Sequence, residues 1–162
     1  MGVDIATPEA GSTTGGLTRD ATLQHGQRFV LVERESGKIL MAIGENALLQ
    51  ACDDMSALPN MWHRHWDCVI EEGWVTLRNR VTQNYLGAAG FRWLSIAPRD
   101  RNFTGYLVVT RSSGGGQTLS AVYQEPLGIK QIVCDGNFNG ERLRLDPGAT
   151  KGLEWEFIML DS

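Results

Sequence analysis

Short runs in which apolar and polar residues alternate make up most of the chain, and polar or glycine-containing turns separate them. The clearest stretch is residues 66–96. A run that starts at Trp66 ends at a Glu-Glu-Gly turn, and Val75 and Leu77 then alternate with polar residues. Two further apolar runs complete the stretch, each after a turn. Alternation with a period of two is typical of half-buried antiparallel strands, so this stretch predicts four short strands.

The four-strand pattern repeats along the chain. Three residues of the first copy recur as the same type 46 positions later: Leu31, Leu40 and Ala42 correspond to Leu77, Leu86 and Ala88. A weaker third copy begins near Leu119, which aligns with Leu31 and Leu77. One four-stranded unit cannot bury its own apolar face, whereas three units around a pseudo-threefold axis can share a core. The pattern predicts one all-β domain, 25–162, with repeats at about 27–72, 73–115 and 116–160.

The last strand of each repeat is predicted from a second spacing. Tyr106 follows Leu94 by 12 positions, and Trp155 follows Leu143 by the same number. Trp66, Tyr106 and Trp155 are therefore expected to occupy equivalent core positions. Burying an aromatic side chain of this size stabilises a fold by about 3 kcal/mol, which is reason enough for its presence.

Two segments of the second copy, Gly73-Trp-Val-Thr-Leu-Arg-Asn79 and Asn84-Tyr-Leu-Gly-Ala88, follow the cadence of a known family. They resemble fascin-like domains of the β-trefoil superfamily, and the resemblance covers roughly residues 27–160. It implies a β-trefoil of three four-stranded repeats with pseudo-threefold symmetry. It also implies a recognition module that binds a macromolecular partner through its loops. Fold alone does not determine the ligand, because unrelated trefoils bind different ones.

Ricin B-type lectins are less similar members of the same superfamily, and they carry a Gln-x-Trp signature at the end of each repeat. The Gln is missing at all three matching positions, which read Arg64-His65-Trp66, Thr104-Gly105-Tyr106 and Leu153-Glu154-Trp155. An atypical lectin therefore stays open as an alternative function, and a ricin-like one is not favoured. Actin bundling is not favoured either, because a single domain would have to dimerise to supply two sites.

The charge of the chain argues against two kinds of partner. The 162 residues carry a net charge of −4, with scattered Arg and Lys residues. Such a chain gives no electrostatic reason to expect a nucleic-acid or an anionic membrane partner. No apolar run approaches the roughly 20 residues that span a bilayer. The expected partner is a protein or a small molecule, and the expected state is a monomer or a weak homodimer.

The N-terminus and the cysteines indicate a cytoplasmic location. Residues 1–24 are small and polar without periodicity, which predicts a flexible leader that could cover a site. The first residues lack the basic start and apolar core of a secretory signal. Three cysteines without metal-binding spacing fit a reducing compartment: Cys52, Cys68 and Cys134. Cys68 shares the alternation phase of Trp66, which predicts a buried thiol.

The first copy carries about five extra residues within 55–65, next to the segment Trp62-His63-Arg64-His65-Trp66. On a strand, alternation would place His63 and His65 on one face and Trp62 and Arg64 on the other. Two histidines so placed could act as an acid/base pair. The segment therefore supports a second function, a small-molecule enzyme of the cyclase or isomerase type. The competing interpretation is a surface strand entry with Trp66 as its buried anchor.

No metal or cofactor is expected. A catalytic zinc usually takes three protein ligands, and no third ligand accompanies the two histidines. The glycine run 114–116 lacks the residues of a phosphate-binding loop.

Further candidate ligand-binding residues lie in the second copy and in a turn of the first. Trp93, beside Phe91 and Arg92, could form an exposed aromatic patch or belong to the core. Arg99 and Asp100 belong to a charged turn whose counterpart in the first copy contains Asp53 and Asp54. Trefoil geometry would place these turns beside the insertion. The alternative for each is an ordinary solvated loop.

Overall fold

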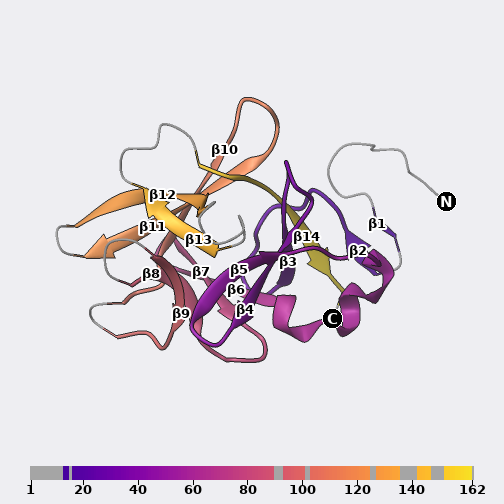
Figure 1. The fold of residues 1–162 in the computed structure, drawn as a ribbon, viewed down its shortest axis with the longest axis horizontal. Coiled ribbons are helices and arrows are strands. Elements are labelled where there is room, and N and C mark those ends of the chain that lie inside the picture. Colours follow the sequence, from indigo (N-terminus) through magenta and orange to yellow (C-terminus); the bar gives the residue numbers. More distant parts are fainter. Residues whose placement is uncertain are drawn as a thin grey trace.

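The computed structural model describes residues 13–14, 16–89, 93–100, 103–124, 127–135, 142–146 and 152–161. Its regular elements are strands and two short 3-10 segments, η2 (Met55–Asn60) and η3 (Trp62–Arg64). The strands are β1 (Thr13–Thr14), β2 (Leu17–Thr18), β3 (Arg28–Glu33), β4 (Ile39–Ile43), β5 (Asn46–Gln50), β6 (Trp66–Glu71), β7 (Trp74–Asn79), β8 (Tyr85–Ala89), β9 (Trp93–Ala97), β10 (Leu107–Arg111), β11 (Gln117–Gln124), β12 (Leu127–Asp135), β13 (Arg142–Asp146) and β14 (Glu154–Leu160). The expected all-β class is confirmed (Figure 1).

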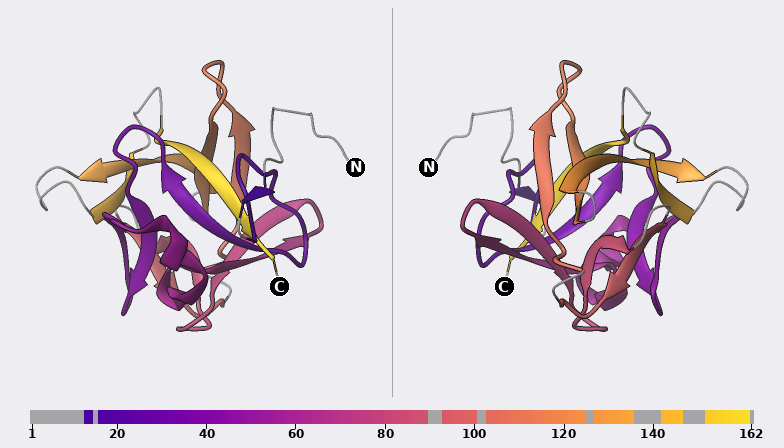
Figure 2. Two further views of the ribbon diagram at one scale, coloured as in Figure 1. Left: turned by 90° about the vertical axis from the view of Figure 1, so that its right-hand side faces the viewer. Right: turned by 90° about the vertical axis from the view of Figure 1, so that its left-hand side faces the viewer.

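Six of the described strands pair in a closed ring. The order is β3, β6, β7, β10, β11 and β14, and β14 pairs back onto β3. Figure 2 shows β14 (yellow) lying alongside β3 (indigo to purple), where the ring closes. A closed ring leaves no unpaired edge among its members, which removes the risk of edge-to-edge association.

The other long strands form three hairpins, β4–β5, β8–β9 and β12–β13. The second strands of these hairpins, β5, β9 and β13, pair with one another. Each hairpin follows a ring strand directly and pairs with it at its start. This arrangement joins the three hairpins into one hydrogen-bonded unit beside the ring (Figure 1).

The core is built from residues at corresponding places in the three segments. Leu31, Leu77 and Leu119 on the first ring strands have no exposed surface. One leucine in each of β5, β9 and β13 is also buried: Leu49, Leu94 and Leu143. Trp66 and Trp155 belong to the same apolar cluster. Each of these core assignments follows from the period-two alternation of the sequence.

Three backbone hydrogen bonds occur at corresponding junctions. Arg34 N donates to Glu154 O (2.8 Å), Arg80 N to His65 O (2.9 Å) and Val122 N to Tyr106 O (3.0 Å). Arg34, Arg80 and Val122 follow the three core leucines of the first ring strands by the same three positions. His65 and Tyr106 are the residues just before β6 and β10, and Glu154 is the first residue of β14. We call these places the 3/1 junction, the 1/2 junction and the 2/3 junction.

The core position predicted for Tyr106 is wrong by one residue. Phe29 pairs with Trp66 and Val75 pairs with Leu107, so Leu107 occupies in β10 the position of Trp66 in β6. Leu107 is 1% exposed, whereas Tyr106 is half-buried and faces outward. A shift of one residue in a strand moves a side chain to the opposite face. The spacing of 12 positions therefore misplaced the aromatic residue.

Part of the predicted leader is packed on the ring. β2 pairs with β14, Arg19 forms an ion pair with Glu156 (2.6 Å), and Ala21 and Leu23 are buried. Residues 1–12 lie outside the described residues. The prediction of a leader that stays loose as far as residue 24 is therefore too long, because small apolar side chains in its second half reach the core. No helix in the described ranges has the length and apolar character needed to cross a membrane.

Candidate functional site

The insertion of the first segment is helical rather than extended. Asp54 caps η2, because its Oδ1 atom accepts hydrogen bonds from the backbone N (3.0 Å) and the hydroxyl (2.6 Å) of Ser56. Asp and Ser favour such caps because their side chains satisfy backbone groups at a helix end. Leu58 is fully buried and anchors the segment. The predicted strand over 62–66 therefore starts only at Trp66, whose indole is buried.

The predicted pairing of His63 with His65 is wrong for the same reason. In this segment the two side chains do not share a face: His63 is exposed, and His65 is 1% exposed. His65 Nε2 lies 2.7 Å from the carbonyl oxygen of Leu58. A carbonyl can only accept, so Nε2 carries the proton and Nδ1 accepts from Arg80 Nη1 (3.2 Å). Both ring nitrogens of His65 thus have structural partners.

The environment of His65 keeps its imidazole neutral. Burial is the largest cause that lowers its pKa, and it acts against the hydrogen bond to Leu58. The positive charges of Arg80 and Arg28 lower the pKa further, and Asp67 acts in the opposite direction. A buried neutral imidazole with both nitrogens engaged is suited to holding Arg80 in place rather than to exchanging protons with a substrate.

Trp62 lies on the surface at the same junction. Its indole is 51% exposed, and the guanidinium of Arg80 lies 4.0 Å from the ring centroid. A small pocket of about 160 Å³ opens beside this pair, lined by Gly16, Arg28, Pro59, His65, Arg80, Leu160 and Asp161. The C-terminus lies next to the coiled 3-10 segments in Figure 1, which is how Asp161 reaches the pocket.

A second cluster contains stacked aromatic rings. Trp74 and Tyr106 stack with ring centroids 5.2 Å apart and an interplanar angle of 2°. The guanidinium of Arg99 lies 5.4 Å from the Tyr106 centroid and 5.3 Å from that of Tyr85. Arg99 also binds the carboxylate of Glu71 through two nitrogens, at 2.9 Å each. We call these five residues the aromatic–arginine stack.

The carboxylate of Glu71 and the guanidinium of Arg99 stabilise each other's charged forms. The hydrogen bond from Arg99 is the main cause that lowers the pKa of Glu71, and the positive charge of Arg99 adds to it. Trp74 is 36% exposed, and Tyr85 and Tyr106 are half-buried. The stack thus offers a flat apolar surface with a carboxylate and a guanidinium held beside it.

The remaining candidates from the sequence are dispersed. Arg64 donates to Gln50 Oε1 (2.9 Å), which ties the insertion to β5. Asp100 Oδ1 accepts the backbone N–H of Phe103 (2.8 Å) and closes its own turn. Asp53 is exposed. Trp93 is half-buried under the guanidinium of Arg142, 3.8 Å from its ring centroid, and its predicted companions Phe91 and Arg92 lie outside the described residues.

The structure separates the two groups that the sequence was expected to bring together. His65 precedes β6, whereas Glu71, the partner of Arg99, ends it. Six residues of extended strand cover about 17 Å from first to last, so the insertion and the 98–100 turn lie near opposite ends of β6. They form two candidate sites rather than one.

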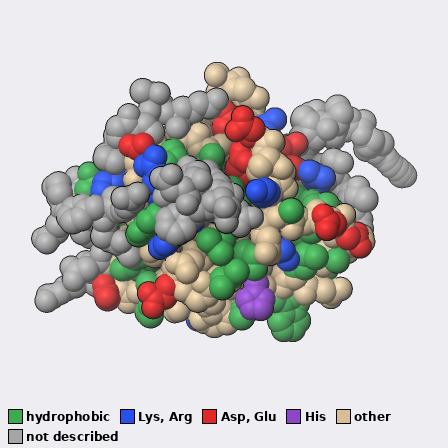
Figure 3. Space-filling view, in the orientation of Figure 1, with side chains coloured by type: hydrophobic (Ala, Val, Ile, Leu, Met, Phe, Trp, Pro, Cys, Tyr) green, Lys and Arg blue, Asp and Glu red, His purple; other side chains and the backbone are tan. Residues whose placement is uncertain are grey.

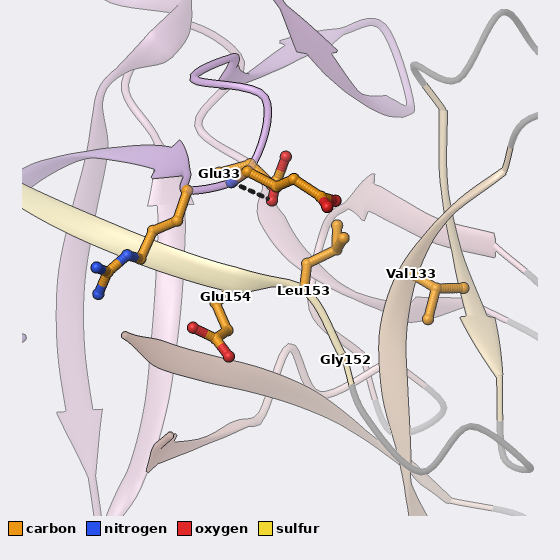
Figure 4. A pocket seen from close by; sticks show the side chains of 7 residues that line it. Glu33, Val133, Gly152, Leu153 and Glu154 are labelled. Atoms are coloured by element: carbon orange, nitrogen blue, oxygen red, sulfur yellow. Dashed lines mark hydrogen bonds between the residues drawn. The ribbon is translucent and has the colours of Figure 1, made fainter. Parts of the chain in front are cut away.

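A third hollow lies at the 3/1 junction. It has a volume of about 410 Å³ and is lined by Glu33, Arg34, Glu35, Val133, Gly152, Leu153 and Glu154. Glu33 accepts backbone N–H groups of Glu35 and Ser36, at 2.9 Å each, and Glu154 accepts the hydroxyl of Ser112 (2.8 Å). Figure 4 shows Leu153 pointing toward Glu33 while Glu154 points away. The carboxylates of Glu33 and Glu154 thus already serve the turns around them.

Four residues of the aromatic–arginine stack were missed as ligand-binding candidates: Glu71, Trp74, Tyr85 and Tyr106. The signal was present for Trp74, because alternation with the buried Leu77 places it on the outer face of β7. For Tyr106 the one-residue error hid the same signal. Within the described residues, no group of three or more His, Cys, Asp or Glu side chains could hold a metal ion. Cys68 is buried as predicted, and burial raises the pKa of its thiol to about 11.

Comparisons with known proteins identify the fold. No protein-family model matches the chain, and no curated protein matches it. Among solved structures, it is similar to a ricin B-like lectin from Macrolepiota procera in complex with lactose, with a TM-score of 0.63 and 13% identity over 88% of this chain and 100% of that one. The likeness shows the fold alone. At such low identity it carries neither a ligand nor a site residue.

Two further similar structures come from bacterial proteins. A GlcNAcα1-4Gal-releasing endo-β-galactosidase from Clostridium perfringens aligns with a TM-score of 0.61 and 15% identity, over 83% of this chain and 33% of that one. The cytolethal distending toxin from Actinobacillus actinomycetemcomitans aligns with a TM-score of 0.54 and 13% identity, over 82% of this chain and 90% of that one. This chain therefore spans about a third of the galactosidase.

Proposed function

We propose that the chain is a non-catalytic β-trefoil recognition module, and that its ligand is a glycan. Three four-stranded repeats, β3–β6, β7–β10 and β11–β14, account for the closed ring, the three hairpins and the three junction hydrogen bonds. The likeness to a lectin and to an enzyme that acts on a glycan supports a ligand of this class.

The observation that carries the proposal is the stacked Trp74–Tyr106 pair beside the Arg99–Glu71 ion pair. One face of a pyranose ring presents C–H groups, which pack well on an exposed indole. The hydroxyl groups at the edge of the sugar need hydrogen-bond partners, and Glu71 can accept while Arg99 donates. Because the rings and the ion pair already hold each other, little conformational entropy is lost on binding.

A fascin-like protein partner is the second candidate. It is favoured by exposed apolar side chains on β4 and η3, two elements that lie against each other: Ile43 is 47% exposed and Trp62 is 51% exposed. In the view of Figure 3, hydrophobic side chains gather on the lower part of the molecule around a histidine. Large aromatic side chains of this kind often anchor protein interfaces. His65 is poorly suited to the acid/base role of the enzyme alternative, because both of its ring nitrogens have partners within the protein.

The test is a glycan array followed by titration calorimetry with the best glycans, starting with neutral galactose- and N-acetylglucosamine-containing oligosaccharides. Trp74→Ala should weaken binding by about tenfold or more, since a buried aromatic contact is commonly among the strongest in an interface. The matched control is Trp62→Ala, which also removes an exposed indole but lies outside the aromatic–arginine stack. Equal loss in both variants, or binding by neither wild type nor variants to any glycan, would overturn the proposal.

A further inference from the structure

The three junctions share one backbone geometry but differ in charge. At the 3/1 junction, Arg34 follows Glu33 and binds the backbone of Glu154. At the 1/2 junction, Arg80 follows Asn79 and binds the backbone of His65. Asn79 reproduces the role of Glu33 in its turn, because its Oδ1 atom accepts the backbone N–H groups two and three residues later, at 3.0 and 3.1 Å. The two junctions are therefore equivalent residue by residue.

The comparison of the two junctions shows how the surroundings of Arg80 differ in charge from those of Arg34. The arginine is kept at both junctions, but the two carboxylates beside Arg34 are replaced beside Arg80 by the neutral side chains of Asn79 and His65. The polar and aromatic contacts of the Arg80 guanidinium are His65 Nδ1 (3.2 Å) and the face of Trp62 (4.0 Å). No ion pair joins Arg80 to any carboxylate in the part of the chain that the structure describes.

The groups around Arg80 keep it oriented toward the pocket at this junction. His65 accepts one of its N–H groups, and Trp62 packs on its plane, so the guanidinium is fixed without being neutralised. Arg28 lines the same pocket and is held by Asp67 through two contacts, at 2.6 and 3.3 Å. Asp161 also lines the pocket and is exposed, but no ion pair links it to either arginine.

The pocket is large enough for a small charged group. Its volume is about 160 Å³, which is more than one water molecule needs. A tetrahedral or planar oxyanion fits such a space, and a guanidinium presents a fork of N–H donors that matches either one. A longer ligand could extend from the pocket over the exposed indole of Trp62.

We propose that the 1/2 junction pocket binds an oxyanion group, a sulfate or a carboxylate, through the guanidinium of Arg80 with Arg28 beside it. The site is separate from the aromatic–arginine stack, which lies near the other end of β7, and the proposal does not depend on the glycan proposal. It assigns a role to the insertion: η2 supplies Pro59 to the pocket lining and the Leu58 carbonyl that orients His65, and η3 supplies Trp62, which packs on Arg80.

The test follows the Nε–Hε signals of the arginines by two-dimensional NMR while sodium sulfate or sodium acetate is added at constant ionic strength. Constant ionic strength removes general screening. The Arg80 signal, identified by its loss in Arg80→Gln, should shift and saturate with at least one anion. Saturation by either anion supports the proposal, and the tighter one identifies the group. Shifts that stay linear, or that affect all arginines alike, would overturn it.

Three variants sharpen the test. Arg80→Gln should weaken anion binding, followed through the Arg28 signal, by about tenfold or more, since a charge-assisted hydrogen bond is lost. Arg78→Gln, two positions earlier and outside the pocket lining, removes the same charge and should leave binding unchanged. Asp161→Asn should tighten binding by about threefold, because it removes a like charge from the rim. Equal weakening by Arg78→Gln and Arg80→Gln, or no tightening by Asp161→Asn, would contradict a local site. Melting curves confirm that each variant is folded, and Asp161→Asn tests the site even if Arg80→Gln does not fold.

Discussion

The indole of Trp74 lies parallel to the phenol ring of Tyr106, with centroids 5.2 Å apart. Trp74 begins β7, Tyr106 directly precedes β10, and the two residues are 32 positions apart in the sequence. They meet because β7 and β10 are neighbours in the ring and pair at Val75 and Leu107. The contact converts two half-exposed side chains into one rigid surface.

The first prediction concerns the energy of this contact. Stacked aromatic pairs contribute about 0.5–1.5 kcal/mol beyond the burial of their area. A double-mutant cycle with Trp74→Ala and Tyr106→Ala, measured by urea unfolding, should give a coupling energy in this range. Additive effects of the two substitutions would show that the rings do not support each other in solution.

The second prediction tests the position of the core in β10. Leu107 is buried and Tyr106 faces outward, so Leu107→Ala should lower the free energy of unfolding by about 2–5 kcal/mol. Tyr106→Ala should lower it by only about 1 kcal/mol. The two are neighbours in the chain, which makes them matched controls in one unfolding experiment. A larger effect at Tyr106 would restore the sequence-based alignment and reject the register seen here.

The third prediction concerns Cys68. Burial raises its pKa from 9.0 to about 11, so at pH 8 only about one thiol in a thousand is ionised in the folded protein. Alkylation with iodoacetamide followed by peptide mapping should leave Cys68 unmodified while the half-buried Cys52 reacts. The pKa of Cys68 is higher in the folded than in the unfolded protein. Its contribution to the free energy of unfolding is therefore complete below pH 9 and is lost as the pH rises from 9.0 to about 11. Rapid alkylation of Cys68 in the native protein would contradict its burial.

The fourth prediction concerns the pH dependence that His65 contributes. Its pKa is lowered below the ordinary value of 6.5, so the unfolded chain binds the proton more readily than the folded one. The contribution of His65 to stability is therefore complete above pH 6.5 and is lost as the pH falls below that value.

Urea unfolding at a series of pH values checks the prediction. The free energy of unfolding should fall between about pH 7 and pH 5, and His65→Gln should reduce this slope whatever it does to the absolute stability. The matched control is His63→Gln, which removes an exposed imidazole from the same segment. An unchanged slope in His65→Gln would show that its imidazole is free to ionise in the folded protein.

The sequence by itself determined the all-β class and most of the core. The alternation of apolar and polar residues indicates which face of a strand is buried. The recurrence of Leu31 as Leu77, 46 positions later, indicates a repeated sequence pattern. These signals are local, or are repeated along the chain, and do not require knowledge of which strands are neighbours. They also held for Cys68, whose burial follows from the phase of Trp66.

Only the tertiary structure decided the candidate sites. The roles of His63 and His65 depended on a capped 3-10 segment, which a five-residue pattern cannot distinguish from a strand. Tyr106 turned outward because the ring register, set by pairing with β7, differs by one residue from the spacing in the third copy. Among the described residues, Arg80 has no ion pair with a carboxylate. The position that Glu154 occupies at the 3/1 junction is occupied by His65 at the 1/2 junction, and only the strand pairing reveals this correspondence. Strand pairing brings together residues that are far apart in the sequence. It therefore decides which charged groups become neighbours and which aromatic rings stack.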